Sequence, residues 1–159
     1  MLNIHPAFAV PLGEIQHPSP DAMNQGLESL ILGLESRGAA HRNPDSVVPQ
    51  PAGLYESTFD FFARPEPVVA QLRTFCWAAL GDLIRQLNAA LEHDVGELRI
   101  GSQSWFHVTR NGGHFGYHNH PMASWSGVYC VSNGDPDPAI PGNGQLTFPT
   151  PTVAANAYL

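Results

Sequence analysis

The most informative part of this chain is residues 114–121, His-Phe-Gly-Tyr-His-Asn-His-Pro, followed by the apolar run at 126–131, Ser-Gly-Val-Tyr-Cys-Val. The first run places two imidazoles two positions apart, just before a segment with the composition of a strand. Because side chains alternate between faces in an extended chain, we expect His118 and His120 to point to the same side. Two neutral imidazoles on one side form half of a divalent-metal site, and imidazole suits iron, zinc, copper and nickel. The sequence therefore predicts a metal-binding pair.

The hydrophobic pattern around this pair has a period of two, which is typical of strands. It begins after Glu97 and includes Leu98, Ile100, Trp105 and Val108, and then the segments 126–131 and 145–148. Turn sequences rich in Gly, Asn and Pro separate these segments, at 111–113, 133–138 and 141–144. Short strands divided by such turns predict a sandwich or barrel.

The first half of the chain has a helical pattern. Residues 66–91 follow the 3.6-residue period and predict a long amphipathic helix, and Ser19-Pro20-Asp21 opens a shorter one that Gly38 closes. Residues 3–16 read as an edge strand at best, and 41–57 as a loop. We therefore predict one α+β domain over 1–159, with two supporting helices in 1–95 and a β-barrel portion in 96–159.

Composition limits the class of protein. The 159 residues are 43% hydrophobic and only 13% charged, which is enough apolar content for one core. A formal charge of −7 argues against a nucleic-acid or anionic-membrane partner, because both are bound largely through Lys and Arg. Cys76 and Cys130 are predicted to be buried reduced thiols. With no signal peptide and no membrane-length apolar run, a cytoplasmic protein is expected.

Other residues near the pair have less specific patterns. His114 is open to three interpretations, as a third ligand, a second-shell group or an exposed loop residue, and His107 suits a structural or pocket-wall role. No nucleophile arrangement stands out around Ser124 and Ser126. The spacing from Gly112 to His120 matches the opening of the first cupin motif, yet the glutamate that this motif then requires is replaced by Ser124 or Trp125.

A second family fits better. The order of short motifs resembles a family of 2-oxoglutarate/Fe(II)-dependent oxygenases found in bacteria and phages, whose members carry a Trp-bearing strand, a Gly turn, His-x-His-Pro, Ser-Gly-Val-Tyr-Tyr and Gly-x-Leu-x-Phe. The corresponding residues here are Ser104-Trp105-Phe106, Arg110-Asn111-Gly112, His118-Asn119-His120-Pro121, Ser126-Gly127-Val128-Tyr129 and Gly144-Gln145-Leu146-Thr147-Phe148. Cys130 replaces the second Tyr. The resemblance covers about residues 97–150.

The resemblance implies a double-stranded β-helix with iron at one end, held by His118 and by His120 in place of the usual carboxylate. It also implies oxidative decarboxylation of 2-oxoglutarate to succinate, coupled to hydroxylation of a C–H bond in a small-molecule or peptide substrate. Candidates for the pocket wall and for binding the co-substrate are Tyr117, Trp125 and Tyr129, with Arg110 as a local stand-in for the anchor of its carboxylate.

Members of that family continue to a distal histidine and then a basic residue, whereas no histidine follows His120 here. We therefore expect a C-terminally truncated form, whether a fragment or a natural short form, unless another residue substitutes. His107, His114 and Arg110 are the local residues available for that. An incomplete barrel would expose sheet edges, which favours self-association. The alternative hypothesis is a non-catalytic or cupin-like metal-binding β-barrel module.

Overall fold

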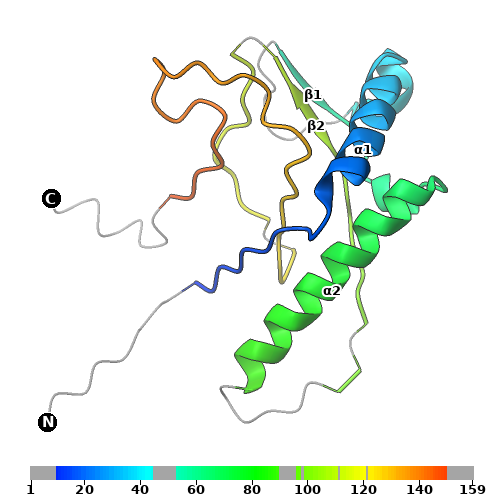
Figure 1. Ribbon diagram of the computed structural model, residues 1–159, viewed down its shortest axis with the longest axis vertical. Coiled ribbons are helices and arrows are strands. Elements are labelled where there is room, and N and C mark those ends of the chain that lie inside the picture. The colour runs from blue at the N-terminus through cyan, green and yellow to red at the C-terminus, as the bar shows by residue number, and fades with distance from the viewer. Residues whose placement is uncertain are drawn as a thin grey trace, which may run out of the picture.

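The computed structural model describes residues 10–44, 53–89, 96–97, 99–110, 112–120 and 122–149. Its elements are helix α1 (Pro20–Glu35), the 3-10 helix η1 (Gly38–His41), strand β1 (Leu54–Glu56), the 3-10 helix η2 (Phe61–Ala63), helix α2 (Pro67–Ala89) and strand β2 (His107–Thr109). Figure 1 shows the two strands side by side, with α1 on one side of them and the chain after β2 looping away on the other.

Helix α1 begins where the sequence predicts. Pro20 occupies the first turn, where its missing N–H removes no hydrogen bond, and Asp21 complements the positive end of the helix dipole. The buried side chains lie three or four residues apart and form one stripe: Met23, Leu27, Ile31 and Leu34. The helix ends at Glu35 rather than at Gly38, which instead starts η1 with a φ of 62°.

Helix α2 confirms the strongest helical prediction, with its first residue one position later than expected and residues 90–91 lying outside the described residues. Its N-terminal half packs against α1 through Val69 and Leu72, which are buried. The two helices approach closely at Gly26, where an added Cβ would lie 3.2 Å from Val68 Cγ2. Further along, the described residues of α2 are half-buried or exposed except Gly81, so the buried apolar side chains of this helix lie near one end only.

Strands β1 and β2 pair antiparallel, with Leu54 opposite Thr109 and Glu56 opposite His107. The pairing continues past the strand ends, because Ser57 N donates to the Phe106 carbonyl at 3.0 Å. Aromatic side chains from this region complete the core against α1 and α2: Tyr55, Phe61 and Phe106. The sequence assigned 41–57 to a loop, so β1 corrects that prediction.

The predicted double-stranded β-helix is wrong. The described residues form an α+β arrangement of two helices and a two-stranded antiparallel sheet that does not close. Of the predicted strands, only the one around Val108 forms, whereas 126–131 and 145–148 contain no strand and Leu98 lies outside the described residues. The proposed edge strand is absent over 10–16, and residues 3–9 are not described.

The residues after β2, which we call the C-terminal segment (112–120 and 122–149), explain this difference. Their backbone hydrogen bonds are turns between near neighbours, as from Ala123 N to the His120 carbonyl. Apolar side chains with strand spacing are largely exposed, including Val128 at 71%, Leu146 at 60% and Phe148 at 67%. A strand is stable only when neighbours satisfy its backbone, so an alternating pattern without a paired neighbour does not form a barrel.

The two cysteines differ in their surroundings. Cys76, on α2, is half-buried, and burial raises the pKa of its thiol. Cys130 is exposed, which corrects the prediction that both thiols are buried, and its Sγ lies 2.8 Å from Asn133 Oδ1. Both are free. In the described part of the chain, no helix has both the length and the apolar character needed to cross a bilayer.

Candidate metal centre

The histidine-bearing part of the C-terminal segment begins at a tight crossing of two chain stretches beside the sheet. Arg110 N donates to the Gly53 carbonyl at 2.7 Å, and Gly113 N donates to the Arg110 carbonyl at 2.9 Å. Gly53 has a φ of 88°, and a Cβ there would lie 2.1 Å from the Arg110 carbonyl oxygen. Only glycine fits this position, so Gly53 fixes where the chain leaves β2.

His118 and His120 lie in direct contact. Their ring centroids are 4.7 Å apart and the ring planes make an angle of 84°. A metal–nitrogen bond of about 2.1 Å puts an ion roughly 3.2 Å from an imidazole centre, so two rings sharing one ion are about 4.5–5.2 Å apart. The observed separation falls within that range, and it is also the separation of an ordinary edge-to-face ring pair.

The tautomer of His118 and the pKa of His120 suit metal binding. The Nδ1 atom of His118 lies 2.9 Å from the Gly116 carbonyl, which can only accept a hydrogen bond, so Nδ1 carries the proton and Nε2 keeps its lone pair in the neutral ring. Burial, and then the nearby charge of His118, lower the pKa of His120 below its usual value. His120 is therefore neutral at pH 7 and available as a ligand.

Five rings, the two of the pair and three others, form a closed series of contacts that we call the ring cluster. The centroid separations are 4.7 Å for His107–Phe115, 4.5 Å for Phe115–His118, 5.7 Å for His120–Trp105 and 6.5 Å for Trp105–His107, in addition to the His118–His120 contact. His107 and Phe115 are stacked at 19°. The cluster thus connects strand β2 and the residues before it with the metal pair.

A buried carboxylate holds one member of this cluster. Glu56, on β1, is 3% exposed and accepts hydrogen bonds from His107 Nε2 at 3.0 Å and from Asn43 Nδ2 at 2.7 Å. Glu56 and His107 face each other directly across the sheet. The sequence analysis missed this carboxylate because it assigned 41–57 to a loop. The signal available was the run Leu54-Tyr55-Glu56-Ser57-Thr58 after Gly53, in which Tyr55 and Thr58 are of types enriched in strands.

Two other predicted site residues are engaged with the helices. Arg110 makes a two-armed pair with Glu35, at the C-terminal end of α1, with NH2 2.8 Å from Oε2. The Tyr129 hydroxyl donates to Asn24 Oδ1 at 2.6 Å, and burial raises its pKa. The ring of Tyr129 packs edge-on against Phe75 of α2. The contacts that the structure gives these two residues are thus with the helical side and not with the metal pair.

Among the described residues, no ring contact or side-chain hydrogen bond joins the remaining candidates to the pair. Tyr117 is 72% exposed and its hydroxyl accepts from Thr147 Oγ1 at 3.1 Å. His114 is exposed, with Nδ1 3.3 Å from the Gly112 carbonyl. Trp125 is half-buried. Among the described residues no group of three or more His, Cys, Asp or Glu side chains is placed to hold an ion, so the structure offers His118 and His120 as a candidate pair without a third ligand.

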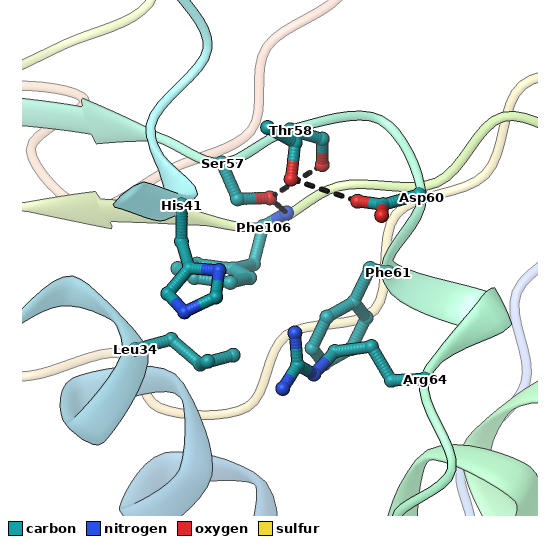
Figure 2. Close-up of a pocket in the computed structure, with 8 residues that line it drawn as sticks. All are labelled: Leu34, His41, Ser57, Thr58, Asp60, Phe61, Arg64 and Phe106. Atoms are coloured by element: carbon teal, nitrogen blue, oxygen red, sulfur yellow. Dashed lines mark hydrogen bonds between the residues drawn. The ribbon is translucent and has the colours of Figure 1, made fainter. Parts of the chain in front are cut away.

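A cavity elsewhere is too small for a substrate. Figure 2 shows the Arg64 and His41 side chains facing a space of about 10 Å³ between α1, η2 and the β1–β2 region, lined also by Phe61 and Phe106. That is room for one water molecule. On the other side of Arg64, a surface hollow of about 210 Å³ contains the Arg64–Glu66 ion pair. Neither space adjoins the ring cluster through a shared residue.

Comparison with known proteins adds no assignment. No protein-family model, curated protein or solved structure matches this chain. The functional interpretation therefore rests on the motifs and on the geometry of the site.

Proposed function

We propose that this chain carries the metal-binding pair of a 2-oxoglutarate- and Fe(II)-dependent oxygenase, with His118 and His120 as the iron ligands. The observation that carries the proposal is the 4.7 Å separation of the two rings. The metal and the co-substrate are chosen from the resemblance of residues 97–150 to that oxygenase family.

The residues present fit such an ion. Imidazole nitrogen is a suitable donor for Fe(II), and a two-histidine set leaves open positions for 2-oxoglutarate and O₂. Bound iron would supply the redox chemistry, in which O₂, 2-oxoglutarate and a substrate C–H bond give succinate, CO₂ and a hydroxylated product. The chain itself would hold His118 in one tautomer through Gly116 and keep His120 neutral by partial burial.

The surroundings of the pair support the other parts of the proposal. Trp105 and Phe115 provide apolar walls for a small-molecule or peptide substrate. A reducing, cytoplasmic setting is consistent with two free cysteines and would keep iron in its ferrous form. In the described residues β2 pairs with β1 alone, so its other edge is the proposed surface for self-association.

A second candidate function is a metal-binding module without catalysis. Two observations favour it. The described residues supply two ligands and no third, and Arg110, the local residue that could hold the 2-oxoglutarate carboxylate, is committed to Glu35. A site of this kind would bind a divalent ion without turning over the co-substrate.

An anaerobic Fe(II) titration followed by tryptophan fluorescence tests both candidates, because Trp105 lies 5.7 Å from His120. We expect one ion per chain, and succinate on addition of 2-oxoglutarate and O₂. His118→Ala should abolish both signals, whereas the matched control His114→Ala, which removes an exposed imidazole outside the pair, should leave them unchanged. Iron binding without succinate would favour the non-catalytic module, and no iron binding would overturn both.

A further inference from the structure

The contacts around the metal pair raise the question of what holds it in place. No β-ladder includes the described residues 112–120. The contacts that connect the two histidines with the sheet region are ring contacts, from Phe115 to His107 and from His120 to Trp105. The position of the pair therefore depends on side chains of β2 and of the residues just before it.

We propose that Glu56 and His107 are positioning residues for the metal pair, and that they act on it through the ring of Phe115. This inference rests on the proposed metal site. It assigns a role to a carboxylate–imidazole pair that would otherwise be only a cross-strand contact.

The first step is the orientation of His107. Glu56 is buried, and Asn43 Nδ2 donates to one of its oxygens at 2.7 Å while the other contacts His107 Nε2 at 3.0 Å. A buried carboxylate with both oxygens engaged has little freedom to turn, so the imidazole it holds is fixed as well. The side chain of His107 is 29% exposed, and the carboxylate defines its ring plane from the sheet side.

The second step is the transfer of that orientation to His118. Phe115 lies nearly parallel to His107, at 4.7 Å and 19°, and meets His118 edge-to-face at 4.5 Å and 71°. Both are preferred arrangements of aromatic rings. Phe115 therefore stands between the fixed imidazole and the ligand. On the far side, Trp105 contacts His120 at 5.7 Å, so both ligands are supported from the same stretch around β2.

A consequence is reciprocal coupling between metal binding and the sheet. If the sheet positions the ligands, an ion that holds the ligands must stabilise the sheet by the same free energy. Positioning groups outside the ligand set commonly change metal affinity by about 10–100-fold. The coupling should be visible at the β1–β2 amides, which no ligand touches directly.

The experiment measures Zn(II) affinity by calorimetry and hydrogen exchange of the β1–β2 amides with and without Zn(II). In the wild-type chain, Zn(II) should slow exchange over 54–57 and 107–110. In Phe115→Ala we expect the affinity to fall about tenfold and the slowing to disappear. Phe115→Tyr keeps the ring and should restore both. Glu56→Gln leaves a single side-chain oxygen for the two donors, Asn43 and His107, and should weaken binding in the same direction.

Phe148→Ala is the matched control, because it removes a phenyl ring that is 67% exposed and stands outside the ring cluster. It should bind Zn(II) as the wild type does. Unchanged affinity and unchanged exchange protection in Phe115→Ala would overturn the positioning role while leaving the metal site intact. Zn(II) binding by the wild type without any slowing at the sheet would do the same. A wild-type chain that takes up no Zn(II) would overturn the metal site and this inference together.

Discussion

Helices α1 and α2 and the C-terminal segment contain similar hydrophobic side chains but use them differently. On α1, Leu27 is fully buried and Leu34 is 2% exposed, whereas Val128 and Phe148 in the C-terminal segment are 71% and 67% exposed. A helix satisfies its own backbone and needs only one packed face. A strand needs neighbours for its backbone as well. The helical pattern of α1 was therefore sufficient to form a regular element within this chain, whereas the alternating pattern of the C-terminal segment was not.

The contrast between the helices and the C-terminal segment is tested most strongly by truncating one side chain in each region. Leu27→Ala should lower the free energy of unfolding by about 3 kcal/mol, because it leaves a cavity between α1 and α2. Val128→Ala should change it by less than about 0.5 kcal/mol, since that side chain is largely exposed. Urea denaturation followed by circular dichroism measures both. A large loss in Val128→Ala would mean that this side chain is packed in solution.

The junction between the two regions provides the next largest effect. Gly53→Ala should destabilise the β1–β2 pair by about 2 kcal/mol, because alanine would need a positive φ and its Cβ would collide with the Arg110 carbonyl. Thermal unfolding measures the loss. Gly33→Ala, at a helical position with open space around it, is the control and should be neutral or slightly stabilising. Equal melting temperatures for Gly53→Ala and wild type would contradict the crossing at this glycine.

A third test uses pH, which we expect to act on the metal pair of the C-terminal segment. The folded-state pKa of His120 is lowered by burial and by His118. The unfolded chain therefore binds this proton more readily, so this group costs no stability above about pH 6.5 and destabilises the fold as pH falls through the folded-state pKa. Protons also compete with the metal, so Zn(II) affinity should drop by up to about tenfold per pH unit for this ligand at low pH. Calorimetric titrations between pH 5.5 and 7.5 measure it, and an affinity independent of pH would exclude imidazole ligation.

The smallest expected effect concerns the ion pair that ties the end of β2 to α1. Arg110→Ala removes the pairing with Glu35, whose side chain is mostly covered while that of Arg110 is half exposed. Solvent screening keeps such pairs weak, so we expect a loss of about 0.5 kcal/mol, reduced further by salt. Unfolding at low and high ionic strength measures it. If the wild-type chain forms succinate, and Arg110→Ala abolishes succinate formation while lowering stability by no more than this small amount, Arg110 anchors the co-substrate after all.

The sequence was sufficient for the helices because their evidence is local. The stripe containing Leu27 and Leu34, and the pattern that places Leu72 on the buried face of α2, each lie within one element. The barrel was predicted wrongly, because the alternating pattern over 126–131 indicates that the segment is compatible with a strand but does not indicate that a neighbouring strand is present to pair with it. The match of this run to a family motif reinforced the error.

In the candidate site, too, contacts within one segment could be predicted, whereas contacts between segments distant in sequence could not. The contact between His118 and His120 could be predicted because the two residues lie two positions apart within one short segment, and their role as metal ligands remains a prediction. Glu56 was missed because its relation to His107 is a register between strands that are 51 residues apart in sequence. Local sequence patterns do not specify such a register, and the turn at Gly53 that sets it has no distinctive motif. The predicted roles of Tyr129 and Arg110 remain predictions, with their contacts now placed on the helices.

The two free cysteines give this chain a chemical reporter in each region. A thiol-alkylating reagent would reach the exposed Cys130 immediately. Cys76 is shielded by its packing on α2, and its raised pKa lowers the fraction of reactive thiolate. We therefore expect Cys76 to be alkylated more slowly than Cys130, so the two rates distinguish the helical region from the C-terminal segment without any engineered label.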